Sequence, residues 1–494
     1  MNSSIREGLR AIVGLEVHVQ LSTRSKVFSR GLTSSLGPNE SIVPLDVAFP
    51  GVLPIPSKQS IELALRTSLL FNCSISSHSW FDRKHYFYAD MPAGYQITQH
   101  EQPIARDGQI NVFILEENIK KSKMVDVIQV QIEHDSGKSI HDDNSSLIDL
   151  NRSGCGLVEI VTSPCFSNGI EASSFIRQLR LLLIHHRICD GQMHKGQLRV
   201  DANVSLMTNK WNGQRTEIKN MNSVGDVHNA IDYEIRRQKE VLNKGEDIVF
   251  ETRTVDTKGR TVCMREKERI DYRFMHEPNI PPIKISNSLL DQSIKFIKSS
   301  IPLHERLIND CGFSPHSAVH LSEEDSLSLF INECIKVNEG KTLSYIRGPL
   351  FMEWLMEVKQ ICQRRRIVYP PTGYSFHIQF IHTILLVKDE KVTKLSALDA
   401  IKEFLDGKYY EKAETWFERR DQWRIRDEEE MKRLIVEVID KWNEKEKVKG
   451  REGNKKILQR MRNEVIIRTE KRIDVDDVRR LIDIILKECI NMME

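Results

Sequence analysis

The sequence predicts an α+β protein in which a strand-rich half precedes a helical half. Residues 1–285 contain repeated stretches that alternate apolar and polar side chains, whereas the remainder places apolar residues at helical spacing. The length of 494 residues exceeds what one compact core usually holds and indicates two or three domains. Strict alternation favours an antiparallel sheet with one packed face and one face open to water or a ligand.

The strands are expected where the alternation is clearest. It runs through residues 12–21, 125–135 and 198–206, and a shorter version covers 215–219. In these stretches mainly aliphatic side chains occupy every second position, and carboxylates, amides and cations occupy the positions between them. Each stretch therefore predicts a half-buried strand with a polar face.

Helix signals interrupt the strands and then replace them. A Pro- and Gly-rich turn at 50–56 precedes one helix, and a second begins at the N-cap Ser223 and stops at Gly245. Prolines between 278 and 282 mark the boundary with the helical half. The predicted domains are 1–285, 286–392 and a highly charged helical tail, 393–494.

Composition excludes several classes of protein. Hydrophobic residues make up 40% and charged residues 29% of the chain, and no apolar run reaches the ~20 residues of a membrane helix, so a soluble protein is expected. The nine cysteines form no C-x-x-C pair, which argues against a disulfide framework or a zinc finger and favours a reducing compartment. The N-terminus leaves no room for a signal peptide and is short for a transit peptide, so the compartment stays open.

Basic residues gather near the end of the chain although the net charge is only +2. Residues 441–472 contain twelve Lys or Arg and five Glu, a net charge of +7. This segment suits a phosphate-rich partner, and the alternative is an ordinary solvated helix face.

Carboxylates on the polar strand faces suggest a metal site. Glu16 and His18 are two residues apart and can point at one ion, and Glu133, Asp201 and Glu217 are further candidate ligands. Oxygen ligands with one imidazole suit Mg²⁺ or Mn²⁺ better than zinc. The alternative is an exposed sheet face that is polar for structural reasons alone.

Cations on the same strands suggest a phosphate site. Arg199, Arg215, Lys219 and Lys138 can supply the positive charge that a triphosphate and its transferring phosphoryl group require.

Several motifs resemble those of one protein family, the B subunits of glutamyl-tRNA(Gln) amidotransferases. In chain order the matching segments are 14–21, 81–88, 94–97, 149–152, 159–161, 198–203, 217–223 and 271–278. The middle of the helical half, from about 365 to 450, departs from the family pattern, while 453–484 is similar to the family's C-terminal tail.

This resemblance implies a fold, an activity and partners. The first domain is expected to be an antiparallel-sheet cradle similar to the catalytic domain of glutamine synthetase, followed by a helical domain and a tail that binds tRNA(Gln). The cradle is expected to bind ATP and Mg²⁺ and to phosphorylate the glutamate carboxylate of misacylated Glu-tRNA(Gln). Ammonia is expected from a partner amidase of the A type, in a heterotrimer with a small third subunit of the C type. The alternative is a non-catalytic tRNA-binding scaffold in the same complex.

The resemblance also implies residue roles. Glu16, His18 and Glu133 match metal-binding positions and, with Lys219, form the expected catalytic set. Bacterial members carry a second Glu where this chain has His134, but the strand period points His134 away from Glu133.

Two further groups of residues are implied. The segment with Arg83, Lys84, Tyr86 and Tyr88 lies near the ammonia path in the family, or alternatively only packs between sheet and helix. The tail residues expected to contact tRNA are Lys455, Lys456, Arg460, Arg462 and Arg468.

The residues of two motifs suggest the cellular compartment. The segments 135–139 and 273–275 are more similar to the mitochondrial branch of the family, which indicates the mitochondrial matrix, with a bacterial or other organellar interior as the alternative.

Overall fold

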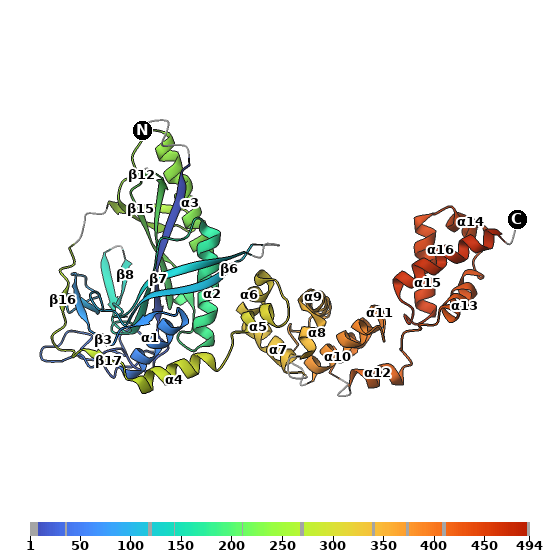
Figure 1. Ribbon diagram of the computed structural model, residues 1–494, viewed down its shortest axis with the longest axis horizontal. Helices are drawn as coiled ribbons and strands as arrows, with labels where there is room; N and C mark the ends of the chain where they lie inside the picture. Colours follow the sequence, from blue (N-terminus) through green and yellow to red (C-terminus); the bar gives the residue numbers. More distant parts are fainter. Residues whose placement is uncertain are drawn as a thin grey trace. The chain divides into compact units, whose positions relative to one another are not determined.

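The computed structural model describes residues 8–34, 37–116, 121–142, 144–209, 211–266, 271–337, 341–371, 375–407 and 412–491. The chain separates into two compact units, Met1–Pro302 and Leu303–Glu494. Strands lie in the first unit, and the second is helical (Figure 1). The predicted α+β class is therefore confirmed.

The first unit is built around one large sheet of ten strands. Its path runs β15-β14-β13-β11-β1-β10-β7-β6-β2, and β12 pairs with β11 off this path. In chain order these strands are β1 (Arg10–Gln20), β2 (Ser74–Ile75), β6 (Ala105–Ile114), β7 (Lys121–His134), β10 (Gly156–Thr162), β11 (Leu198–Thr208), β12 (Trp211–Asn212), β13 (Thr216–Met221), β14 (Glu251–Val255) and β15 (Thr261–Glu266).

The sheet is mixed, which corrects the expectation of a purely antiparallel one. The β13–β14 pair is parallel, whereas the other pairs of this sheet are antiparallel. A parallel neighbour needs a crossover connection, and a long helix between the two strands provides it. Alternation of side chains within one strand cannot reveal this, because it is the same in parallel and antiparallel neighbours.

Smaller sheets complete the first unit, together with five helical segments among its described residues. The remaining strands are β3 (His78–Ser79), β4 (Asp82–His85), β5 (Tyr95–Thr98), β8 (Lys138–Asp142), β9 (Ser145–Asp149), β16 (Met275–His276) and β17 (Ile283–Lys284). The helices are α1 (Lys58–Leu70), α2 (Gly169–His185), a 3₁₀ turn at Met193–Lys195, α3 (Val224–Asn243) and α4 (Asn287–Lys298).

Helix α3 shows why the sequence folds as predicted. The Ser223 side chain accepts a hydrogen bond from the Asp226 backbone N–H at 2.9 Å, which caps the helix start. Gly245 has a φ of +85°, the left-handed conformation that commonly follows a helix end. Between these ends Val227 and Ile231 are fully buried and pack on the sheet.

One continuous core fills the first unit. Val17, Ile132, Ile160 and Val200 come from neighbouring strands, share the apolar face of the sheet and are completely buried. Helices α1, α2 and α3 pack on strands of this sheet, and α2 lies beside α3 (Figure 1). The opposite face of the central strands carries their polar side chains.

The second unit consists of helices. They are α5 (Leu303–Asn309), α6 (Pro315–Glu323), α7 (Asp325–Lys336), α8 (Lys341–Ile346), α9 (Gly348–Arg365), α10 (Phe376–Lys388), α11 (Lys394–Leu405), α12 (Ala413–Arg419), α13 (Glu428–Ile439), α14 (Glu444–Arg451), α15 (Lys455–Arg468) and α16 (Val475–Asn491). Residues between Ile425 and Leu486 form their own hydrophobic cluster.

The compact first unit ends later than the predicted cradle, because α4 packs on α1. The predicted boundary at residue 392, between a helical domain and a helical tail, stays a prediction. Among the described residues, no helix combines the length and apolarity needed to cross a bilayer.

Candidate active site

The polar side chains of the central strands meet on one face of the sheet. Strand β1 lies between β10 and β11, and its register places His18 opposite both Glu159 of β10 and Arg199 of β11. Two residues earlier, Glu16 lies opposite Asp201 of β11. Alternation within each strand therefore becomes a continuous polar surface across three strands.

Three of these side chains form a candidate metal centre. Ligand atoms of His18, Glu133 and Glu159 all lie within 4.8 Å of one another, and His18 Nε2 is 3.8 Å from Glu159 Oε2. Glu133 is 3% exposed, and its Oε2 atom has no hydrogen-bond partner among the described residues. Buried carboxylate oxygens are normally paired, so this atom fits a site completed by a cation.

The pKa of Glu159 also supports a cation at this site. Burial raises the pKa of Glu159; His18 opposes the rise, and the neighbouring Glu133 and Glu16 carboxylates add to it. Carboxylates crowded in this way are stabilised by a divalent cation, and two carboxylates with one imidazole suit Mg²⁺ or Mn²⁺. The ligands predicted from the sequence omit Glu159, because its short strand is apolar on both sides of it and shows little alternation.

Glu16 is on the same face but outside this group of three. Its Oε1 accepts a hydrogen bond from Asn203 Nδ2 at 2.9 Å. Its role as a metal ligand stays a prediction.

Asp201 and Glu217 do not join His18. Lys219 Nζ lies 3.4 Å from Asp201 Oδ2 and 3.2 Å from Glu217 Oε1. Burial lowers the pKa of Lys219, but Asp201 and Glu217 outweigh burial and raise it. These two carboxylates therefore pair with a cation of the protein itself, and their role as metal ligands stays a prediction.

Arg199 is directed at a carboxylate next to the metal centre. Its Nη2 donates to Asp135 Oδ2 at 2.9 Å, and Arg152 Nε lies 3.4 Å from the same oxygen. Arg199 Nε is buried and has no hydrogen-bond partner among the described residues. One donor of this guanidinium therefore stays free for a ligand.

Lys138 and Arg215 lie apart from the cluster. Lys138 is exposed on β8 opposite Asp149, and β8 pairs only with β9 among the described strands. Arg215 is exposed before β13, and its guanidinium lies 5.6 Å from the centre of the Phe250 ring. The structure does not bring these two cations to the metal centre.

A pocket of about 1010 Å³ has Lys219, the ion-pair partner of Asp201 and Glu217, in its lining. Its lining includes Lys84, Tyr86, Tyr88 and Lys219, together with the strap, which we define as residues 271–275. Lys219, predicted as a catalytic residue and as a cation for phosphate, thus lines one cavity with Lys84, Tyr86 and Tyr88 of the segment expected near the ammonia path. The strap is part of the motif at 271–278. Its position in the sequence does not reveal that it folds back to line this pocket.

Lys84 connects the pocket to the metal centre electrostatically. Burial lowers the pKa of Lys84, but the Glu133 and Glu159 carboxylates outweigh it and raise the pKa. Lys84 therefore stays charged beside the carboxylates. Burial also raises the pKa of Tyr86, with Glu133 adding to the rise, so that its hydroxyl stays protonated.

Arg83 and His134 point elsewhere. Arg83 donates two hydrogen bonds to the buried Glu277, at 2.6 and 3.0 Å, which favours its packing role. His134 Nδ1 accepts the Ile97 backbone N–H at 3.0 Å, and burial lowers the pKa of His134 to about 4. The prediction that His134 points away from Glu133 is confirmed.

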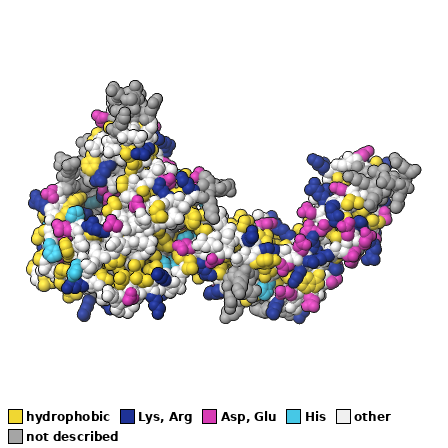
Figure 2. Space-filling model, viewed as in Figure 1, with side chains coloured by type: hydrophobic (Ala, Val, Ile, Leu, Met, Phe, Trp, Pro, Cys, Tyr) yellow, Lys and Arg dark blue, Asp and Glu magenta, His cyan; other side chains and the backbone are white. Residues whose placement is uncertain are grey.

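The tail residues expected to bind tRNA lie on α15, within the second unit. Lys455 and Lys456 are exposed, whereas Arg460 lies 3.2 Å from Glu446 and Arg468 lies 3.6 Å from Glu464. Arg462 is half-buried, with an Nε atom that has no hydrogen-bond partner among the described residues. Figure 2 shows acidic and basic side chains interspersed over this unit.

Comparison with known proteins agrees with this architecture. Residues 11–291 match the family described as the GatB/GatE catalytic domain, a region that spans nearly all of the large sheet and its polar face. The first unit is therefore a catalytic domain of this class.

Relatives match over almost the whole chain. The B subunit of mitochondrial glutamyl-tRNA(Gln) amidotransferase from Danio rerio is 36% identical over 96% of this chain and 88% of the relative. The mitochondrial protein of the same name from Aedes aegypti is 35% identical over 94% and 91%. The B subunit of aspartyl/glutamyl-tRNA(Asn/Gln) amidotransferase from Thermodesulfovibrio yellowstonii is 35% identical over 97% and 99%. The chain belongs to the B-subunit family of these tRNA-dependent amidotransferases.

Proposed function

We propose that this chain activates the side-chain carboxylate of glutamate on misacylated Glu-tRNA(Gln) with ATP, so that ammonia converts it to the amide of Gln-tRNA(Gln). The observation that carries the proposal is the cluster of His18, Glu133 and Glu159 beside a pocket with lysines on its wall. The reaction class is a ligase that forms a carbon–nitrogen bond with an amide nitrogen donor, and its product serves translation.

The chemistry explains why such a site needs cations. A carboxylate resists attack by ammonia, and phosphorylation turns one of its oxygens into a good leaving group. Mg²⁺ held by His18, Glu133 and Glu159 would supply charge neutralisation where triphosphate and carboxylate meet. Lys84 and Lys219 add fixed positive charge on the pocket wall.

Aromatic side chains shape the rest of this pocket. Tyr86 and Tyr88 have ring centres 5.5 Å apart, and Tyr272 and Phe274 of the strap lie 6.2 Å apart. These rings give the pocket apolar surface beside its lysines.

Partners supply what the chain lacks. The sequence contains no Gly- and Ser-rich amidase signature, so a partner amidase of the A type is proposed to release ammonia from glutamine. A small subunit of the C type completes the proposed heterotrimer, and tRNA(Gln) is the RNA partner. The relatives are themselves named as one subunit of an amidotransferase, which supports a complex of several chains.

The mitochondrial matrix is the proposed location. Two observations support it. The residues at 135–139 are similar to the mitochondrial branch, and two relatives that match over most of the chain are named as mitochondrial proteins. Import of the tagged chain into mitochondria tests this assignment, and retention of the tag in the cytosol contradicts it.

The test of the proposed function is ATP-dependent formation of Gln-tRNA(Gln) by the complex purified with its interacting chains. A complex that binds Glu-tRNA(Gln) without consuming ATP would favour the scaffold alternative. The presence of His134 is one reason for that alternative, but His134 faces the apolar side and so leaves the metal centre unchanged.

The isolated chain is expected to release no ammonia from glutamine and to accept added ammonium salts instead. The physical reason is that its proposed site activates a carboxylate and contributes no amidase nucleophile. Ammonia release from glutamine, measured with the chain alone, checks this, and glutaminase activity that co-elutes with the pure chain would contradict it.

Neutralising the tail cations is expected to weaken tRNA binding. A deletion from residue 441 would strip Ile435 and Val438 of their packing partners on α15 and α16, so substitution is the cleaner test. We expect the Lys455→Gln, Lys456→Gln, Arg468→Gln variant to lower the slope of log affinity against log salt by about 2 to 3, at about 0.7 to 0.9 for each phosphate that is no longer bound.

A matched control for that measurement is the Lys58→Gln, Lys295→Gln, Lys298→Gln variant, which removes three exposed cations of the first unit. Equal salt slopes for the tail variant and the wild type would identify the tail cations as a solvated helix face.

A further inference from the structure

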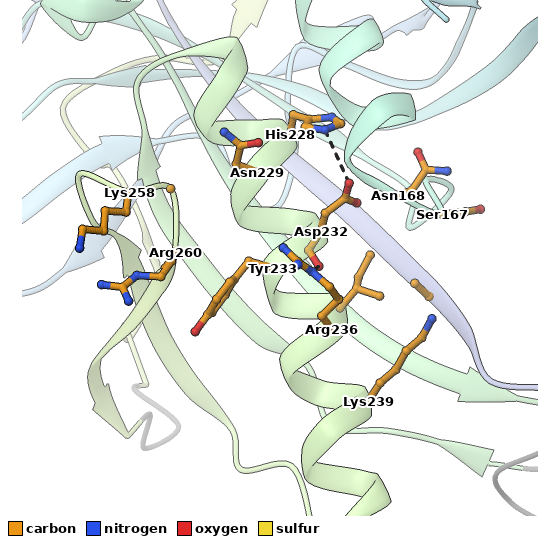
Figure 3. Close-up of a pocket in the computed structure, with 13 residues that line it drawn as sticks. Ser167, Asn168, His228, Asn229, Asp232, Tyr233, Arg236, Lys239, Lys258 and Arg260 are labelled. Carbon is orange, nitrogen blue, oxygen red and sulfur yellow. Dashed lines mark hydrogen bonds and ion pairs between the residues drawn. The ribbon is translucent and has the colours of Figure 1, made fainter.

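An open groove lies on the outer surface of the helical layer, away from the active site. It has a volume of about 590 Å³ and is formed mainly by α3, the β14–β15 turn and the residues before α2. Figure 3 shows the side chains that line it. No residue of this groove belongs to the predicted or observed active site.

The sheet separates the groove from the metal centre. On α3, Val227 and Ile231 are buried against the sheet, whereas Arg236 and Lys239 are exposed. The α3 side of the sheet carries the apolar side chains of β11, while His18 is on the opposite, polar face. A ligand in the groove therefore cannot touch the reacting groups.

The groove carries a net positive charge. Arg236, Lys239 and Lys258 line it. None of the three forms an ion pair with a carboxylate of the described residues, and Arg236 Nε donates to the Asp232 backbone carbonyl at 3.3 Å. The carboxylate on its wall, Asp232, is engaged: its Oδ1 accepts the Gly169 backbone N–H at 2.7 Å, and its Oδ2 lies 3.7 Å from His228 Nε2. The three cations outnumber this one carboxylate, so the groove keeps net positive charge for an anionic partner.

The β14–β15 turn fixes two of the groove's cations. The side chain of Asp256 accepts the backbone N–H groups of Lys258 and Arg260 at 2.9 and 2.8 Å, and the Arg260 guanidinium at 2.8 Å. Gly259 has a φ of +72°, and a Cβ there would lie 3.0 Å from the Cβ of Asn229 on α3. This close approach holds the turn against the helix, so the cations project from a rigid support.

We propose that this groove binds the sugar–phosphate backbone of the RNA substrate, an inference that takes its choice of partner from the proposed function. Figure 3 shows Lys258 and Arg260 on one side of Tyr233, and Arg236 and Lys239 on the other. A site for one small anion converges its donors on a point. Cations distributed along an open groove instead match phosphates repeated along a strand.

The test is the Arg236→Gln, Lys239→Gln, Lys258→Gln variant of the full-length chain in its complex. Binding of a tRNA(Gln) transcript is measured at several salt concentrations, with the Lys58, Lys295 and Lys298 variant defined above as the charge-matched control. We expect the groove variant to bind about tenfold more weakly near ~0.1 M salt, and its salt slope to fall by about 2 to 3. The control variant should match the wild type.

Three outcomes overturn the inference. The first is an unchanged affinity and salt slope. The second is loss of inorganic phosphate binding with tRNA affinity unchanged, which identifies a small-anion site. The third is loss of the partner chains with tRNA affinity unchanged, which identifies a protein interface.

A kinetic readout separates this inference from the proposed function. Because the groove lies across the sheet from the metal centre, the variant should keep kcat for amidation while KM for the aminoacyl-tRNA rises. If the wild-type complex forms no Gln-tRNA(Gln), the proposed function fails, but the comparison of salt slopes still decides whether the groove binds RNA.

Discussion

Replacing His18 with Ala is expected to abolish ATP-dependent formation of Gln-tRNA(Gln) and to leave tRNA binding nearly intact. His18 supplies the imidazole among three ligand atoms within 4.8 Å of one another, so its loss leaves two buried carboxylates without their third partner. Loss of a metal that neutralises phosphate charge should reduce kcat by at least about a thousandfold. Single-turnover amidation and tRNA binding, measured on the same preparation, check both halves of this expectation.

Further variants sharpen that test. Glu133→Gln keeps the shape of the side chain but removes its charge, and should match His18→Ala. The control is His194→Ala, an exposed histidine outside the cluster of His18, Glu133 and Glu159. Wild-type turnover in His18→Ala or Glu133→Gln would remove the metal assignment.

Glu16→Ala decides between two roles for this carboxylate. A loss equal to that of His18→Ala places Glu16 among the metal ligands. A loss below about tenfold leaves it as the hydrogen-bond partner of Asn203.

Lys26→Met is expected to destabilise the first unit by about 3 to 5 kcal/mol, the usual range for breaking a buried ion pair. The Lys26 side chain is 0% exposed and pairs with Asp46, whose side chain is 2% exposed. Without Lys26 the Asp46 carboxylate is buried with no neutralising charge. The free energy of unfolding, measured by urea titration of the full chain, checks this value.

Two comparisons identify the cause of that loss. Adding Asp46→Asn removes the stranded charge but keeps the oxygen that accepts the Val43 backbone N–H, so the double variant should recover most of the stability. Burial already raises the pKa of Asp46 despite Lys26. Removing Lys26 raises it further, so the destabilisation should grow as pH rises and shrink in acid, where Asp46 is protonated in both states. A pH-independent loss would point to packing.

The strands could be predicted from the sequence because successive side chains of a half-buried strand face the core and the solvent in turn, so apolar and polar residues alternate. The predicted stretch 198–206 lies within β11, and the predicted N-cap Ser223 caps α3 as expected. The parallel pairing of β13 with β14 and the return of the strap to the pocket could not be predicted. Both depend on contacts between segments that are distant in the chain. The periodicity of residues within one segment gives no information about such contacts.

The candidate site was predicted only partly for the same reason. His18 and Glu133 could be chosen because each stands on a polar face of an alternating strand. Glu159 sits in a strand buried on both faces, so its sequence carries little alternation. Asp201 and Glu217 share the polar face, but the nearby Lys219 takes up their charge, and only side-chain geometry reveals this pairing.

The end of β7 places two chemically different neighbours in two different environments. Glu133 faces the metal centre and His134 faces the core, where it contacts Met91 and Phe28. Substitutions at these two positions should therefore have independent effects. A change in the length of β7 is a different matter, because inserting or deleting one residue would turn the carboxylate into the core and the imidazole toward the pocket. This strand should thus tolerate changes of side chain at position 134 far better than any change in the number of its residues.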